Sequence, residues 1–514
     1  MTGPVFVESN VLVDAGFSEL KALRALNPPP VPFPEGLDFM TPIVRPPGPP
    51  NRGLIGNFPL GSKDPLGLFT QWARTYGDIF HYRVFLYHVY FLNHPDFIEY
   101  VLASHHRYFH KGRALLANRR IFGNGLLTSE GDFWLRQRRL IQPSFNRERI
   151  ASYAGAMVAT AERTIATWQD GEVRDIHRDM MRLTLEIVAQ SLFNIDIARE
   201  TAKMSVALNT LVEMGSRGRL LLPPILRLLP TPKNLRYHRA IRQLDDIVYG
   251  LIHERRTRGH TIAKHLTPCD VDQSVPRHGD ATLAHCEAPK DPDGDGDLLS
   301  RLLRAQDEDG SRMTVQQLRD EALTLLLAGH ETTALSLSWT WFLLAQHPEV
   351  EARLWEELRE VLHGRSPQAE DLLELSYTER VVKESLRLYP PAWAIARTAV
   401  KECEIGGYRV PAGTHVAMSP WVMHRDPRYY DHPERFNPDR WVDASRLPRF
   451  AYFPFGGGPR ICVGAPFAMM ESVLLLALIA QRFRIRLAPD HSVVPLPAIT
   501  LRPRNGIWVV LSRR

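Results

Sequence analysis

A chain of 514 residues is long enough for two to four domains of ordinary size, or for one unusually large domain. Hydrophobic residues make up 44% of the chain and charged residues 23%, so we expect a globular protein with a deep core. The net charge of +6 is spread too thinly over this length to indicate a nucleic-acid-binding protein. It is compatible with an acidic protein partner or with anionic groups on a cofactor.

Cysteine usage favours a reducing compartment. Cys269, Cys286, Cys403 and Cys462 form no C-x-x-C pair, and four cysteines in a chain of this length make no disulfide framework. Residues 1–26 contain no basic segment followed by a long apolar core, so neither a signal peptide nor a membrane anchor is expected. We therefore expect a cytoplasmic protein.

Proline dominates residues 27–50, where the rings fix φ and remove backbone donors. This stretch is expected to run extended over the surface. It ends an N-terminal extension (residues 1–45) and leads into one main domain (residues 46–514). Strand-like runs follow around 79–94, and the pattern from about 97 to 255 is mostly helical.

Residues 258–297 show little periodicity and predict a flexible surface loop. Asp291, Asp293 and Asp295 mimic the start of a calcium-binding loop, but the twelfth position, where a bidentate glutamate is needed, is Leu302. The cysteines and histidines of this segment also lack paired zinc spacing. Calcium and zinc sites are therefore minor alternatives, and Asp297 is expected to cap the following helix.

One long proline-free helix is predicted from Thr314 to about Gln346, with a capping box at its start and His347-Pro348 at its end. Further elements are expected as helices to about 363 and near 377–388, strands around 395–418, a loop-rich meander to about 450, and a last helix after Cys462 followed by strand-like segments. The sequence thus predicts a mainly α fold with small β-sheets (α+β) in a single large domain.

The long helix has a polar break in an apolar run. Leu323–Ala345 spans 23 residues, enough to cross a bilayer, yet it contains His330 and Glu331. A membrane span with a functional break is one interpretation, and a core helix that is apolar nearly all round is the favoured one. Ala328, Glu331 and Thr332 stand at i, i+3 and i+4 and share a face. With Gly329 easing a local distortion, this pattern suggests a proton relay beside a bound small molecule.

A glycine-rich loop with a single cysteine spans residues 455–464, in the order Phe455, Gly456, Gly457, Gly458, Pro459, Arg460, Ile461, Cys462, Val463 and Gly464. Three consecutive glycines allow close approach to a flat partner. A helix N-terminus follows the cysteine and favours a thiolate there. A phosphate or dinucleotide site is not indicated, because the segment has neither a following G-K-[S/T] nor the spacing G-x-G-x-x-G. A buried structural cysteine remains the alternative.

This loop resembles the haem-binding signature F-x-x-G-x-R-x-C-x-G of the cytochrome P-450 family at every specified position. Four other segments match motifs of the family in order and approximate spacing. They are Ala328–Thr333 (A-G-x-[D/E]-T-T), Glu384–Arg387 (E-x-x-R), Pro433–Phe436 (the meander motif) and Trp134–Arg138 (W-x-x-x-R). The resemblance covers about residues 46–514 and implies a soluble haem-thiolate monooxygenase domain. In that fold, haem b lies between the long distal helix and the helix after the cysteine.

The resemblance implies roles for individual residues. Cys462 is expected to bind the haem iron as its axial thiolate, with the loop residues Phe455 and Gly456 against the cofactor. Haem propionates need cationic partners, and the residues implied are Trp134, Arg138, Arg397, Arg460 and Lys111. Glu384, Arg387 and Arg435 are expected to form a structural cluster that serves folding and haem retention.

Thr332 and Glu331 are implied to deliver protons during oxygen activation, so that one atom of molecular oxygen is inserted into an apolar substrate. Hydroxylation or epoxidation of a lipid, fatty acid, terpenoid or steroid is expected. Apolar residues are expected to line the substrate pocket: Leu325, Ala328, Ala392, Trp393 and Ile499.

No dinucleotide fingerprint is visible in the chain, so electrons from NAD(P)H are expected through a ferredoxin- or flavodoxin-type carrier and its reductase. Arg136 and Arg139 are candidates for docking that carrier, with a solvated helix face as the equal alternative. Two other functions stay open. One is a peroxide-dependent peroxygenase or hydroperoxide isomerase on the same fold, and the other is a non-enzymatic haem sensor.

Overall fold

A computed structural model describes residues 44–50, 64–194, 231–265 and 297–514, with a few isolated positions between 56 and 62 and between 204 and 211. The chain forms two compact units that alternate along the sequence. Unit 1 comprises Met1–Arg113 and Ser376–Met470, and unit 2 comprises Ala114–Leu375 and Glu471–Arg514.

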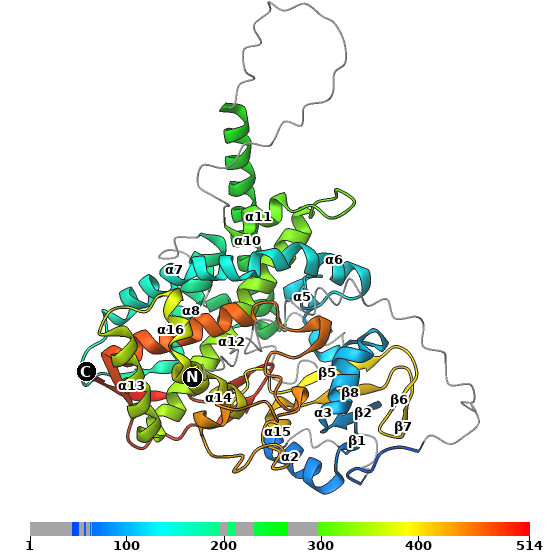
Figure 1. Ribbon diagram of the computed structural model, residues 1–514. Coiled ribbons are helices and arrows are strands. Elements are labelled where there is room, and N and C mark those ends of the chain that lie inside the picture. The colour runs from blue at the N-terminus through cyan, green and yellow to red at the C-terminus, as the bar shows by residue number, and fades with distance from the viewer. Residues whose placement is uncertain are drawn as a thin grey trace, which may run out of the picture. The chain divides into compact units, whose positions relative to one another are not determined.

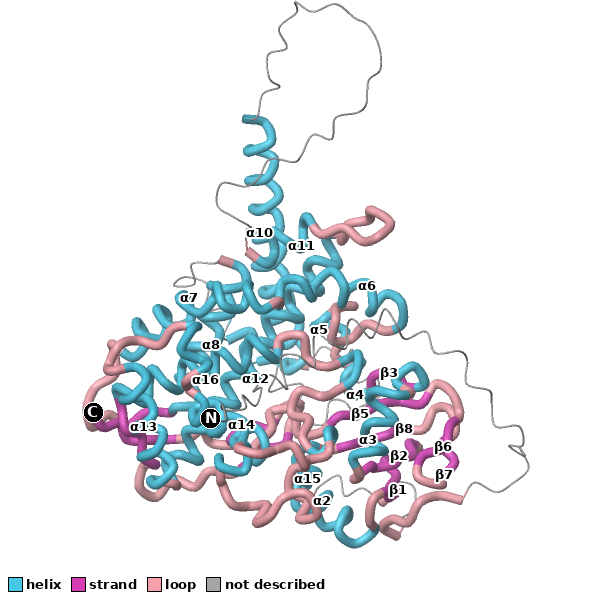
Figure 2. Tube along the Cα trace, in the orientation of Figure 1, coloured by secondary structure: helices cyan, strands magenta, loops and turns pink. Residues whose placement is uncertain are grey.

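Unit 1 is built on a five-stranded sheet with the order β1-β2-β8-β5-β3 (Figure 2). Its strands are β1 (Ile79–Val84), β2 (Tyr87–Leu92), β8 (His415–Met418), β5 (Ile395–Ala399) and β3 (Phe109–Lys111). β2 and β8 run parallel, and the other neighbours are antiparallel. The strands expected around 79–94 and 395–418 are thereby confirmed.

The remaining elements of unit 1 are short, apart from two helices. They are α2 (Pro65–Tyr76), α3 (Pro95–Glu99), η2 (Tyr100–Ser104), η3 (His106–Tyr108), α14 (Ser376–Leu388), β6 (Cys403–Ile405), β7 (Tyr408–Val410), α15 (Pro420–Met423), η8 (Pro438–Trp441), η9 (Arg449–Ala451) and η10 (Gly458–Arg460). The helix expected near 377–388 is α14.

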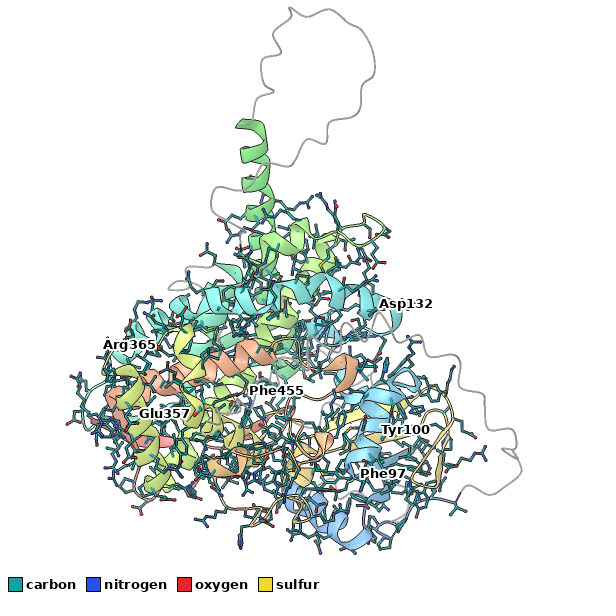
Figure 3. All side chains as sticks on the ribbon, viewed as in Figure 1. Phe97, Tyr100, Asp132, Glu357, Arg365 and Phe455 are labelled. Carbon is teal, nitrogen blue, oxygen red and sulfur yellow. The ribbon has the colours of Figure 1, made fainter. Side chains whose placement is uncertain are left out.

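Alternation along β1 and β2 sends apolar side chains to both faces of the sheet. On one face Phe80 and Phe91 stack with ring centroids 4.7 Å apart, and Phe69 of α2 stacks on Phe91 at 5.3 Å. The other face buries a second cluster, against which Phe97 and Tyr100 pack (Figure 3). Both faces of the sheet are therefore covered, as a sheet inside a large domain requires.

Unit 2 is organised around α12 (Val315–Gln346), which is buried along most of its length. Thr314 and Gln317 form the expected capping box, and the helix ends before His347. α8 (Ile176–Phe193) packs along α12, and α7 (Arg147–Ile165) lies beside α8 (Figure 1). The predicted core helix is thus confirmed.

The other elements of unit 2 surround this helical core. They are α5 (Arg119–Phe122), α6 (Gly131–Ile141), η4 (Gln142–Phe145), β4 (Val173–Asp175), α10 (Pro232–His265), α11 (Leu298–Arg304), α13 (Pro348–Leu362), η7 (Ala369–Leu373), β9 (Phe483–Leu487), β10 (Pro495–Pro497), β11 (Leu501–Pro503) and β12 (Trp508–Arg513). α4 (Arg113–Leu116) and α16 (Ala465–Arg482) contain residues of both units.

The expected loop at 258–297 needs a correction at its start, because α10 continues to His265. Asp297 caps α11 as predicted, and its carboxylate accepts a hydrogen bond from the Ser300 amide at 2.8 Å. Residues 266–296, with both of their cysteines and the calcium-loop mimic, lie outside the described residues, as do residues 1–43.

Within the described part of the chain, α16 is the one helix with the length and apolar character of a membrane span, and 67% of it is buried in the protein. Glu471 lies in this helix and is fully buried. Neither of its carboxylate oxygens has a hydrogen-bond partner among the described residues. Burial raises the pKa of Glu471 well above its ordinary value and so favours the neutral form of the side chain in the folded protein.

This buried acid predicts a pH-dependent penalty that a Glu471→Gln variant lacks. Above about pH 4.5 the unfolded chain releases a proton that the folded protein keeps, so folding stability falls as pH rises toward the raised pKa. The expected slope is about 1.4 kcal/mol per pH unit. Denaturant melts of both proteins between pH 5 and pH 8 should show the variant gaining on the parent as pH rises. A constant difference across this range would contradict a neutral Glu471.

Candidate active site

The cysteine loop of unit 1 is a tight turn held by its own backbone. Gly456 and Gly458 have φ of 74° and 64°, and the Cys462 amide donates to the Phe455 carbonyl at 3.0 Å. A Cβ on Gly458 would stand 1.9 Å from the Leu102 carbonyl oxygen, so only glycine fits there. Phe455 opens the loop (Figure 3), and the residue of Cys462 is exposed. The loop therefore presents an accessible thiol just before α16.

Three cations gather near this loop within unit 1. Lys111 of β3 pairs in register with Arg397 of β5, and both side chains are largely buried. Arg460 donates from Nη1 to the Phe109 carbonyl at 2.7 Å, two residues before Lys111. The loop and the sheet edge thus bring Lys111, Arg397 and Arg460 into one region of unit 1. Such a set of cations suits a ligand with more than one carboxylate.

A buried ion pair supports the loop from α14. Glu384 and Arg387 are both fully buried, and Arg387 donates to the two carboxylate oxygens at 2.8 Å from Nε and from Nη2. The Arg387 carbonyl lies 3.2 Å from Nδ1 of His424, whose Nε2 accepts from the Phe453 amide at 3.0 Å. Burial, followed by the charge of Arg387, lowers the pKa of His424 well below its usual range. A neutral imidazole therefore links the ion pair to the segment that enters the cysteine loop.

The third member of this cluster is Arg440, and the assignment of that place to Arg435 was wrong. Arg440 donates from Nε to Glu384 Oε1 at 2.9 Å, and Trp441 donates from Nε1 to Oε2 at 3.0 Å. Arg435 is exposed and contributes only its backbone carbonyl, which accepts from Arg387 at 3.1 Å. The tetrapeptide Pro438–Trp441 repeats the proline–acid–arginine–aromatic pattern of Pro433–Phe436. Only the arginine of the second copy, which lies in η8, reaches the carboxylate of Glu384.

On α6 of unit 2 the predicted tryptophan is buried, and Arg138, four residues later, is partly buried. Arg138 donates from Nε to Gln142 Oε1 at 3.2 Å. Arg136 and Arg139, the candidates for carrier docking, both pair with Asp307 at 3.1 Å. Their charges already have a carboxylate partner within the chain, which weakens the docking interpretation.

The polar break of α12 adjoins an accessible strip of the helix. Ala328 is exposed, Leu327 before it is buried and Gly329 after it is partly buried, and Thr332, one turn later, is partly exposed. The Thr332 hydroxyl donates to the Ala328 carbonyl at 2.7 Å, so its oxygen lone pairs remain as acceptors. On the α8 side, Thr184 donates to the His330 carbonyl at 3.0 Å, and a Cβ on Gly329 would lie 3.2 Å from Val188.

Glu331 points to a different set of partners than the sequence suggested. Its carboxylate is buried and forms an ion pair with Arg502 of β11, whose Nε donates to Oε1 at 2.8 Å. The Thr500 hydroxyl donates to the same oxygen. Thr500 and Arg502 stand 169 and 171 residues from Glu331 in the sequence, so no local spacing could have identified them.

The predicted pocket residues do not share one environment. Leu325 is buried in α12, Ala328 and Ile499 are exposed, and Ala392 is partly buried. Trp393 packs against the aromatic cluster of unit 1, with its ring 6.4 Å from that of Phe69. A cavity of about 670 Å³ in unit 2 is lined by other residues: Arg139, Leu140, Pro143, Ser144, Asn146, Glu148, Arg149, Arg301, Ala305 and Gln306.

These residues fit the haem that the sequence resemblance implies. An accessible thiol projects from a glycine turn that fits closely against the backbone at Leu102, and three cations lie in the same unit. Thiolate sulfur is an iron ligand, and buried arginine and lysine suit propionates. The donor set therefore matches both ends of the cofactor.

Comparisons with known proteins agree with this fit. The profile of the family described as Cytochrome P450 matches residues 46–509. The chain is 36% identical to cyclooctatin synthase of Streptomyces melanosporofaciens, over 87% of this chain and 91% of that protein. It is 36% identical to pentalenene oxygenase of Streptomyces avermitilis, over 87% and 92% respectively. It is also 37% identical to cyclooctat-9-en-7-ol 5-monooxygenase of S. melanosporofaciens, over 83% and 85%.

The two arginines of the meander give a matched pair of variants. Arg440→Ala removes a charged hydrogen bond to a buried carboxylate and is expected to cost about 2–3 kcal/mol of folding stability. Arg435→Ala removes an exposed side chain and should change stability by no more than about 0.5 kcal/mol. Urea unfolding measures both. Equal losses in the two variants would contradict the assignment of Arg440 to the cluster.

Proposed function

Because this chain belongs to the cytochrome P450 family, we propose that it is a monooxygenase that hydroxylates or epoxidises a cyclic terpenoid. The observation that carries the enzyme class is the accessible thiol of Cys462 in its glycine turn. The substrate class is supported by three relatives at 36–37% identity, whose names specify pentalenene, cyclooctatin and cyclooctat-9-en-7-ol.

Cys462 is proposed as the axial ligand of haem b. Lys111, Arg397 and Arg460 of unit 1 are proposed to bind the propionates, as are Trp134 and Arg138 of unit 2. When bound, haem with a thiolate ligand supplies the oxygen-activating chemistry. Phe455 and the flat backbone at Gly456 are proposed to lie against the ring. The protein's own contribution is to orient the cofactor and to supply protons.

Thr332 is proposed to hold a water molecule through the lone pairs of Oγ1. Its hydroxyl hydrogen is engaged with the Ala328 carbonyl, so the oxygen accepts a hydrogen bond rather than giving one. Glu331 is proposed to exchange protons with that water. The exposed methyl group of Ala328 leaves room beside it for an apolar substrate, and Leu325, Ala392, Trp393 and Ile499 stay proposed as further pocket residues.

Electrons are proposed to come from NAD(P)H through a reductase and a separate ferredoxin- or flavodoxin-type carrier, in the cytoplasm. A peroxygenase or hydroperoxide isomerase is the alternative enzyme, and a haem sensor is the alternative without catalysis. Turnover with peroxide but not with reductase and carrier would favour the first alternative. Absence of turnover with every donor would favour the second.

Cys462→Ser tests the thiolate. The reduced, carbon monoxide-bound protein is expected to show the long-wavelength Soret band of a thiolate-ligated haem, because sulfur donates electron density to the iron. The variant should lose that band. Cys403→Ala removes the other described cysteine, which is buried in unit 1, and should keep it. Retention of the band in the Cys462 variant would exclude this residue as the ligand.

Thr332→Val tests the water-holding hydroxyl. Substrate binding, read as the shift of the Soret band, should be unchanged, whereas product formed per NAD(P)H consumed should fall by about 10-fold or more. Thr333→Val is the matched control, because the buried Thr333 hydroxyl has no hydrogen-bond partner among the described residues. Equal effects of the two substitutions would argue against a specific role for Thr332.

Substrate class is tested by titrating the purified protein with cyclic terpene hydrocarbons and alcohols, steroids and long-chain fatty acids. The terpenoids are expected to shift the Soret band at lower concentration than the other two classes, because the relatives are named for such compounds. Tighter binding of fatty acids or steroids would overturn the proposed substrate class and leave the enzyme class intact.

A further inference from the structure

The buried carboxylate of Glu331 is held by one of its two oxygens. Thr500 Oγ1 donates to Oε1, Arg502 Nε donates to Oε1 at 2.8 Å, and Arg502 Nη2 lies 2.7 Å from the same atom. Among the described residues, no hydrogen bond reaches Oε2. About 8% of the side chain is accessible, and Oε2 is absent from the buried atoms that lack a partner. One oxygen is thus fixed by protein, and the other can reach water.

The holding residues are themselves fixed to α12. Arg502 lies in β11 (Leu501–Pro503), and Thr500 directly precedes this strand. Trp339, two turns after Glu331 on α12, donates from Nε1 to the Leu501 carbonyl at 2.9 Å. The strand is therefore joined to the helix between the two residues that hold the carboxylate. This support restricts the position of Oε1 relative to the helix axis.

The two neighbouring histidines add no charge to the ion pair between Glu331 and Arg502. His330 lies next to Glu331 on α12, and His177 lies on α8 with Nδ1 3.2 Å from Ser338 Oγ. Burial, followed by the charge of Arg502, lowers the pKa of each histidine to about 3. Both rings are neutral at ordinary pH. The positive charge that faces Glu331 among the described residues is therefore that of Arg502.

An accessible strip of α12 lies beside Glu331 in the sequence. Ala328 and Thr332 stand three residues before and one residue after Glu331, and both are accessible. The Thr332 hydroxyl already donates a hydrogen bond to the Ala328 carbonyl. A water bound at Oγ1 therefore donates its hydrogen bond to that oxygen. A water held at Thr332 Oγ1 can exchange a proton with a nearby carboxylate.

We propose that Arg502 and Thr500 are positioning residues that hold Glu331 by Oε1 and so direct Oε2 toward the water at Thr332. Oε2 accepts a proton from a water that regains one by exchange with bulk solvent, and passes it to the water at Thr332, which releases one of its own protons into the site. The carboxylate is then ionised again, and the protein consumes no net proton. The guanidinium of Arg502 forms the ion pair with this carboxylate, with Nη2 2.7 Å from Oε1. This inference rests on the proposed function of Thr332 and Glu331.

The test compares four variants of the haem-loaded protein by two readouts, an infrared spectrum without substrate and the product formed per NAD(P)H consumed with substrate. Arg502→Met removes the charge, Arg502→Lys keeps it, and Thr500→Val removes only the hydroxyl donor. Arg504→Ala is the control, because Arg504 is an exposed residue two positions further along the chain. The infrared readout is the C=O stretch of protonated carboxyls at pH 7. Its Glu331 part is the difference between each protein and the same protein carrying Glu331→Gln, because the buried Glu471 favours the protonated form in both. The infrared readout requires no turnover.

The parent, Arg502→Lys and Arg504→Ala are expected to lack the Glu331 part of this band, and Arg502→Met is expected to show it. Product per NAD(P)H should fall about 10-fold in Arg502→Met and recover in Arg502→Lys. In Thr500→Val the Glu331 carboxylate should remain ionised. Product per NAD(P)H should still fall in part, because Oε1 is less well fixed. Should Arg502→Met fold poorly, as judged by circular dichroism, the Thr500→Val yield decides the matter.

An ionised Glu331 in Arg502→Met, or a full product yield in Thr500→Val, would overturn the role of the holding residues. Failure of the proposed function would be detected by separate experiments. The Cys462→Ser spectrum and the comparison of Thr332→Val with Thr333→Val do not depend on Arg502. A positive infrared result without the thiolate band would support the charge pairing and reject the monooxygenase.

Discussion

The carboxylate of Glu384 is the buried charge on which unit 1 depends. It is fully buried and accepts hydrogen bonds from the Arg387 and Arg440 guanidinium groups, the Trp441 indole and the Asn437 amide. A carboxylate removed from water costs many kcal/mol unless such donors replace the water. The donors come from α14 and from the meander, so the two segments cannot separate without stranding the charge.

The consequences of this pairing extend to the cysteine loop. Arg387 also donates to the His424 carbonyl at 2.7 Å, and the neutral His424 ring joins the Arg387 carbonyl to the Phe453 amide. Tyr452 adds a hydrogen bond from its hydroxyl to the Lys383 carbonyl at 3.0 Å. The chain therefore enters the turn at Phe455 from a fixed direction. The turn is then closed by the bond between the Cys462 amide and the Phe455 carbonyl at 3.0 Å.

Elements with local causes could be predicted from the sequence. The capping box at Thr314 and the cap at Asp297 depend on residues within three positions, and both are present in the structure. The loop motif also needed no tertiary information. Arg440 was missed because two neighbouring tetrapeptides carry the same pattern, and only burial distinguishes them. Arg502 was missed because its contact with Glu331 joins segments 171 residues apart, for which spacing holds no information.

The register between β3 and β5 has a consequence of its own. Phe109 faces Ala399 and is fully buried, while Lys111 faces Arg397 on the same side two positions along. Since side chains alternate along a strand, a slip of one residue would bury His110 in place of Phe109 and turn Lys111 to the opposite face. The burial of Phe109 therefore fixes the register of β3 against β5. That register in turn fixes where the charged side chains of Lys111 and Arg397 lie.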